Sequence, residues 1–142
     1  MKITKSFLQD YMRVKDELEN VKYRLELYLN EQKTTEYGMP RGNTISDPTA
    51  AKALIKVQLT SEIKELTEQE EQMRVEIMNA FKKIPYPIDR QIMNLRYIDG
   101  LEWSEIAYVV FNKKWDYLDR EDKYVKKAYN IHSKALKVLK EL

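Results

Sequence analysis

The stretch Leu95–Val110, LRYIDGLEWSEIAYVV, joins two short apolar-patterned segments at Asp99-Gly100. Apolar residues recur at helical spacing on both sides of this corner. Gly100 stands where a helix commonly ends in a left-handed residue, a conformation that glycine adopts without a steric penalty. The stretch therefore predicts two short helices, Ile88–Asp99 and Glu102–Val110, that meet at a sharp turn.

Upstream of the corner, the chain has the pattern of two long, charged helices. From Ser6 to Asn30, apolar residues recur in alternating steps of four and three, which is the heptad seam of a coiled coil. A second helix is predicted from Pro48 to about Lys83, because Asp47-Pro48 supplies an N-cap acceptor followed by a proline at the first helical position. Glycines and prolines between them predict a loop over residues 31–47. We expect a long antiparallel helical hairpin.

Composition narrows the class of protein. A chain of 142 residues with 43% hydrophobic and 34% charged residues is typical of a soluble helical protein, and three glycines leave little room for a turn-rich β fold. We therefore expect an all-α fold. The absence of cysteine excludes disulfides and thiolate chemistry and fits a reducing cytoplasm. No apolar run approaches the ~20 residues that span a bilayer, so no membrane association is expected.

The last helix, predicted to begin near Asp119 and to run to Leu142, has two unlike faces. The last twenty residues carry six lysines and one carboxylate, a net charge of +5, although the whole chain carries only +2. At ~100° per residue, one side gathers Val125, Ala128, His132, Ala135, Leu139 and Leu142. The opposite side gathers Lys123, Lys126, Lys127, Asn130, Lys134 and Lys137. Lysines so spaced suit DNA phosphates, and asparagine can read adenine in the major groove.

Helix, glycine turn, short helix and basic final helix follow one another in the order of a helix-turn-helix DNA-binding unit. We assign its core to Leu95, Gly100, Ile106, Ala107, Ala128, His132 and Ala135. His132 is expected to be a packed side chain rather than a ligand, and Trp103 and Trp115 are expected to be core and loop anchors. The chain then divides into a hairpin, residues 1–84, for oligomerisation or partner binding, and a DNA-binding domain, residues 85–142.

The segment LRYIDGLEWSEIA (Leu95–Ala107) resembles region four of bacterial sigma factors. Two further motifs are MPRG (Met39–Gly42) in the loop and YNIHSKAL (Tyr129–Leu136) in the final helix. Through these three motifs together, the chain resembles the ArpU/RinA-type transcriptional regulators of phages and prophages of Gram-positive bacteria. The resemblance implies a cytoplasmic regulator, usually of late phage genes, that acts on a promoter without an enzymatic step.

The sequence departs from this family pattern at two points. Sigma-type units usually have Ser or Thr as the cap of the second short helix, where this chain has Glu102. The connection Phe111–Asp119 is longer than the usual turn of about three or four residues. We therefore predict which face of the final helix contacts DNA, and we assign no residue of that face to a particular base.

Three functions stay open. The first is a regulator that binds double-stranded DNA as a homodimer through its N-terminal helices, with host RNA polymerase as a further partner. The second is a small terminase subunit for phage DNA packaging, which would assemble as a ring. The third is a helical adaptor that binds only protein. The chain has one histidine, no cysteine, no Gly-rich phosphate loop and no cluster at metal-ligand spacing, so we expect no enzyme, no metal and no cofactor.

Overall fold

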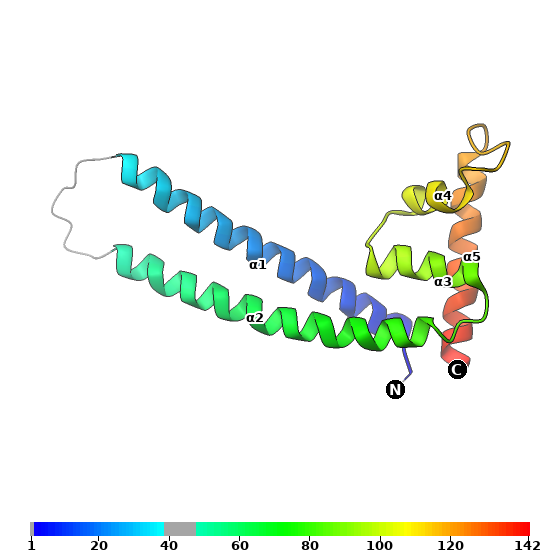
Figure 1. Cartoon of the computed structure of the whole chain (residues 1–142), viewed down its shortest axis with the longest axis horizontal. Helices are drawn as coiled ribbons and strands as arrows, with labels where there is room; N and C mark the ends of the chain where they lie inside the picture. The colour runs from blue at the N-terminus through cyan, green and yellow to red at the C-terminus, as the bar shows by residue number, and fades with distance from the viewer. Residues whose placement is uncertain (1, 39–47) are drawn as a thin grey trace. The chain divides into compact units, whose positions relative to one another are not determined.

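The computed structural model describes residues 2–38 and 48–142, and every regular element in these ranges is a helix (Figure 1). The elements are α1 (Lys5–Gly38), α2 (Pro48–Phe81), α3 (Pro87–Met93), the π-helix η1 (Asn94–Ile98), α4 (Trp103–Phe111) and α5 (Glu121–Glu141). The expected all-α class is confirmed for these residues. None of these helices is both long enough and apolar enough to cross a membrane.

The first helix continues well beyond its expected end at Asn30, since α1 extends to Gly38. The prediction that a loop begins at residue 31 is therefore wrong. The physical reason is that no glycine or proline interrupts residues 31–37, so backbone hydrogen bonding continues until Gly38. The second helix begins at Pro48 as predicted. The MPRG segment lies outside the described residues.

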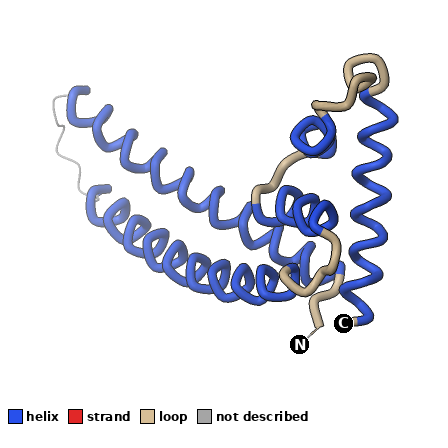
Figure 2. Tube along the Cα trace, turned by 45° about the vertical axis from the view of Figure 1, so that its right-hand side comes forward, coloured by secondary structure: helices blue, strands red, loops and turns tan. Residues whose placement is uncertain are grey.

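The chain divides into two compact units. One, here called the C-terminal unit, comprises Met1–Met12 and Gln72–Leu142, and the other, the helix-pair unit, comprises Arg13–Glu71. In the helix-pair unit, the segments of α1 and α2 lie side by side (Figures 1 and 2). Its buried apolar residues are Val14, Val21, Leu59 and Leu66, spaced seven apart on each helix as a coiled-coil seam requires.

This division differs from the expected one into residues 1–84 and 85–142 because both ends of the chain contribute to one core. That core cluster comprises Ile3, Leu8, Tyr11, Ile77, Phe81, Ile84, Met93, Tyr97, Ala135 and Leu139. A side-chain hydrogen bond also joins the start of the chain to α5, because Lys2 Nζ donates to the backbone carbonyl oxygen of Lys140 (3.2 Å). The first residues of the chain therefore belong to the unit that contains the final helix.

A second core cluster holds α3, α4 and α5 together. It comprises Ile92, Ile106, Ala107, Phe111, Tyr117, Tyr124 and Ala128. Ile106, Ala107 and Ala128 are completely buried, and Leu95 packs half-buried against the cluster. Alanines at these positions let α4 approach α5 closely, since a longer side chain would separate the two backbones.

The corner at Gly100 forms as predicted, but the helix before it is not a single α-helix. Gly100 has φ of 72°, in the left-handed region. The last turn before it is a π-helix, in which the Asp99 N–H donates to the carbonyl of Asn94 (3.0 Å). The Arg96 side chain stabilises this turn, because its Nη1 donates a hydrogen bond to the carbonyl oxygen of Leu101 (3.0 Å).

The helix after the corner is capped although it lacks Ser or Thr. The backbone N–H of Glu102 donates to the Glu105 carboxylate (3.1 Å), which is one half of a capping box. The departure at Glu102 therefore leaves α4 with a capped start.

Candidate nucleic-acid interface

The final helix, α5, begins two residues later than predicted. Its N-cap is Arg120 rather than Asp119, because the backbone N–H groups of Asp119 and Arg120 both donate to the carbonyl of Asp116 and continue the preceding turn. The acidic residues of the first turn are Glu121 and Asp122, whose charge favours the N-terminal end of the helix dipole.

One face of α5 packs against α3 and α4 and against the start of the chain. Its buried residues are Tyr124, Ala128, His132, Ala135 and Leu139. Tyr124 is buried where Val125 was expected, and Val125 is half-buried. Leu142 was expected on this face but is exposed, because it lies beyond the last helical residue, Glu141.

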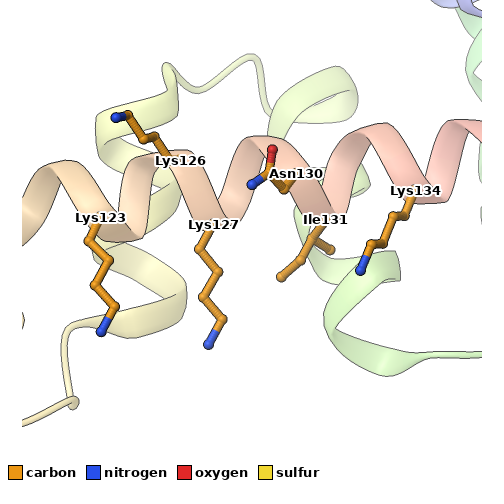
Figure 3. A pocket seen from close by; sticks show the side chains of 6 residues that line it. All are labelled: Lys123, Lys126, Lys127, Asn130, Ile131 and Lys134. Atoms are coloured by element: carbon orange, nitrogen blue, oxygen red, sulfur yellow. The ribbon is translucent and has the colours of Figure 1, made fainter.

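The opposite face of α5 is exposed and cationic. Its side chains, here called the lysine face, are Lys123, Lys126, Lys127, Asn130, Lys134 and Lys137, and all six are exposed. Five of them, with Ile131, line an open depression on the helix surface (Figure 3). In that view Lys123, Lys127 and Lys134 point to one side and Lys126 points to the other. The cations therefore spread over a broad strip instead of converging on one point.

Two of these lysines are oriented by aromatic rings beneath them. Lys123 Nζ lies 5.4 Å from the ring centroid of Tyr124 and 3.7 Å from Asp116 Oδ2. Lys127 Nζ lies 5.3 Å from the ring centroid of Phe111. Cation–π contacts of this kind hold the aliphatic stems while the ammonium groups still reach water. The end of the lysine face nearest α4 is thus positioned before any partner arrives.

Carboxylates gather on a different side of the same unit. A groove between α4 and α5 is lined by apolar side chains that include Tyr108 and Val109, and its charged lining residues are Glu105, Glu121 and Asp122. On a helical wheel at ~100° per residue, Glu121 and Asp122 fall outside the arc of the lysine face. A polyanion would therefore be attracted to one side of α5 and repelled from the other.

The connection between α4 and α5, Asn112–Arg120, is an ordered series of turns. Asp116 is buried and its Oδ1 accepts a hydrogen bond from the Tyr124 hydroxyl, while Tyr117 is buried in the second core cluster. The hydrogen bond from Tyr124 lowers the pKa of Asp116 and raises the pKa of Tyr124. No periodicity in the sequence marks this pair, whose members are eight residues apart in two different elements.

Trp115 does not anchor this connection, so that prediction is wrong. Its side chain is 93% exposed, and Tyr117 occupies the buried position instead. The physical reason is that the turn carries Asp116 and Tyr117 toward the core, which leaves the preceding residue on the outside. Trp103, in contrast, packs against the second core cluster as expected.

His132 is buried in a cluster of rings. It is 3% exposed, and the Tyr97 hydroxyl lies 2.6 Å from its Nε2. The ring centroid of Trp103 lies 4.8 Å from that of His132, and Arg96 Cζ lies 5.0 Å from a ring centroid of Trp103. Burial is the main cause that lowers the pKa of His132 to about 4, and the charges of Arg96 and Lys5 add to it. The expectation that His132 is a packed side chain is confirmed.

Within residues 2–38 and 48–142, no three His, Asp or Glu side chains are grouped so that they could hold a metal ion. Comparisons of the chain with models of protein families, with curated proteins and with solved structures find no match. The resemblance to ArpU/RinA-type regulators and the helix-turn-helix interpretation therefore stay predictions.

Proposed function

We propose that this protein is a sequence-specific regulator of transcription that lays the lysine face of α5 in the major groove of double-stranded DNA. The observation that carries the proposal is the separation of charge on α5. Its cations occupy one exposed face, its packed residues occupy the opposite face, and the nearby carboxylates of Glu105, Glu121 and Asp122 line a groove outside both. Phosphate neutralisation by such a face supplies affinity, whereas base contacts supply sequence choice.

The side-chain directions on α5 suit a groove with phosphates along both of its walls. Lys126 points away from Lys123, Lys127 and Lys134 (Figure 3). On a helical wheel at ~100° per residue, Asn130 falls between Lys126 and these three lysines. In this arrangement the lysines contact the two phosphate backbones and Asn130 meets the base edges at the centre of the groove. An amide side chain there would read adenine through two hydrogen bonds.

Dimerisation through the N-terminal helices is part of the proposal. Apolar side chains of the helix-pair unit stay exposed, namely Tyr23, Leu27, Leu29, Leu54 and Val57. A dimer that buries them would carry two lysine faces, and for such a dimer we expect half-sites separated by about one helical turn of DNA, ~34–36 Å, or a multiple of it. The same side chains also support a small terminase subunit, for which the oligomer would be a ring rather than a dimer.

The resemblance to ArpU/RinA-type regulators supports late phage promoters as the target and host RNA polymerase as a further partner. It also supports action in the bacterial cytoplasm. These three inferences rest on the motifs in Met39–Gly42, Leu95–Ala107 and Tyr129–Leu136 and not on the charge pattern of α5.

The test compares two double variants that change net charge equally. Lys127→Glu with Lys134→Glu reverses charge on the lysine face, and Lys22→Glu with Lys64→Glu reverses two exposed lysines of the helix-pair unit. Binding is measured by fluorescence anisotropy on DNA fragments tiled across the region around the gene, at two salt concentrations. We expect one fragment to bind well above the others, the α5 double variant to lose binding, and the control to bind like the wild type.

Circular dichroism establishes that both double variants are folded. If the folded α5 double variant keeps its affinity, the lysine face is not the DNA-binding surface. Equal, weak binding to every fragment together with a ring-sized oligomer would favour DNA packaging. A wild-type protein that binds no fragment would favour the adaptor that binds only protein.

A further inference from the structure

We propose that the connection Asn112–Arg120 is a second DNA-contacting element, in which the Trp115 indole stacks against bases of the duplex while Lys113 and Lys114 bind phosphates. This inference rests on the proposed function of α5. It adds a stacking contact that the lysine face does not supply.

The first observation is the exposure of Trp115. At 93% it is the most exposed of the large hydrophobic side chains within residues 2–30 and 50–142. Burying a tryptophan side chain removes ~150–250 Å² of its surface from water. An indole that stays in solvent therefore does not contribute this hydrophobic free energy to folding. The neighbouring aromatic residue, Tyr117, is buried in the core. The connection therefore leaves Trp115 and Leu118 in solvent, while Asp116 and Tyr117 between them are buried.

The second observation is the order of the backbone around Trp115. Lys114 N–H donates to the carbonyl of Phe111 (3.0 Å), and Tyr117 N–H donates to the carbonyl of Lys114 (3.1 Å). The Asp116 carboxylate is held by the Tyr124 hydroxyl. Trp115 thus extends from a turn that is bonded on both sides, so less backbone entropy is lost when it contacts a ligand.

The third observation is the charge around the indole. Lys113 and Lys114 directly precede Trp115 and are exposed. The adjacent carboxylate, Asp116, is turned inward and lies 3.7 Å from Lys123 Nζ. Because Lys123 is also the first residue of the lysine face, the connection directly adjoins that face. Cations that frame an exposed aromatic ring are the composition of a nucleic-acid stacking site.

The charge also decides between DNA and a protein partner. An apolar protein surface would gain nothing from the two lysines and would have to desolvate them. In a duplex each base face is covered by its neighbour, so the indole would insert at a base step and partly unstack it, while phosphates beside that step bind the lysines. An acidic protein surface is the alternative occupant that the experiment below separates.

The experiment compares Trp115→Ala with Leu118→Ala on the best-bound DNA fragment. Leu118 is the matched control because it is 83% exposed in the same connection. Stacking on a base is worth about 5- to 150-fold in affinity, and unstacking the base step offsets part of that gain. We therefore expect Trp115→Ala to weaken binding about 5-fold or more and Leu118→Ala to change it less than about twofold. The salt dependence of Trp115→Ala should equal that of the wild type, because no charge is removed.

Tryptophan fluorescence supplies a second readout. Bases stacked on Trp115 should quench the emission of the wild-type protein as DNA is added, and Trp115→Ala should lose that quenching while it keeps the Trp103 emission. If Trp115→Ala binds DNA like the wild type and the Lys127→Glu, Lys134→Glu variant does not, this inference is overturned and the role of α5 stands. If the wild-type protein binds no DNA, both proposals fail and an acidic protein becomes the expected occupant.

Discussion

At the scale of single residues, the C-terminal unit buries two polar side chains, Asp116 and His132. Asp116 stays charged because Tyr124 donates a hydrogen bond to its carboxylate, which lowers the pKa of Asp116. His132 stays neutral because burial lowers its pKa to about 4. Each pKa shift favours one protonation state in the folded protein, so each side chain links the stability of the C-terminal unit to pH.

The pKa of His132 predicts a loss of stability in mild acid. Between pH ~6.5 and pH ~4 the unfolded chain binds a proton at this histidine and the folded chain does not, so stability that is complete above this window is lost as pH falls. From pH 7 to pH 5 the free energy of unfolding should fall by about 2 kcal/mol. Urea unfolding at the two pH values measures this change.

The control for this prediction is His132→Phe, which keeps a ring in the same space. It removes the hydrogen bond to Tyr97, so it should be less stable at pH 7. Its stability should nevertheless vary less between pH 7 and pH 5 than that of the wild type. An equal variation in both proteins would show that His132 does not carry the acid response.

At the scale of elements, α5 combines two functions on opposite faces. Ala128 and Ala135 are fully buried and allow neighbouring helices to approach closely, while the lysine face stays in water. Lys123 and Lys127 lie over aromatic rings, whereas Lys126 points to the other side of the helix (Figure 3). The two edges of the lysine face should therefore contact different phosphate backbones.

This arrangement predicts a measurable change in the salt dependence of DNA binding. Lys126→Ala should weaken binding similarly on all sequences and should reduce the slope of log affinity against log salt by about 1, because one phosphate contact is lost. Lys22→Ala, which removes an exposed lysine from the helix-pair unit, should leave the slope unchanged. Anisotropy titrations at four salt concentrations give both slopes. An unchanged slope in Lys126→Ala would place the DNA on the other edge of α5.

At the scale of the whole molecule, the unit that carries α5 is completed by the beginning of the chain. Ile3, Leu8 and Tyr11 lie in the same cluster as Ala135 and Leu139 of α5. The segment 85–142 alone would therefore leave the apolar face of this cluster open to water. The integrity of the lysine face depends on residues that lie more than a hundred positions earlier in the sequence.

A core substitution near the N-terminus should therefore destabilise the C-terminal unit. Leu8→Ala removes a completely buried side chain and should lower the free energy of unfolding by about 2–5 kcal/mol. Val75→Ala, in α2 within the same C-terminal unit but 57% exposed, should change it by less than about 0.5 kcal/mol. The emission of Trp103, which lies in the C-terminal unit, reports the unfolding. Equal stability of the two variants would show that α5 does not need the N-terminal residues.

The sequence by itself determined the features that depend on local spacing. It predicted the all-α class, the start of α2 at Pro48, the left-handed Gly100 and the exposure of all six side chains of the lysine face, because helical periodicity and backbone conformation are set by residues a few positions apart. It also placed Ala128, His132 and Ala135 on the buried side of the last helix.

Only the tertiary structure decided what depends on contacts between distant residues. In the structure, Ile3 and Leu8 share a core cluster with residues of α5, Asp116 accepts a hydrogen bond from Tyr124, and Trp115 is exposed. No periodic pattern in the sequence predicts these three features. The depressed pKa of His132 likewise depends on burial beneath rings from other elements. Burial is set by the packing of the whole unit, so residue type and spacing along the chain do not determine which polar group enters the core and which aromatic ring stays outside.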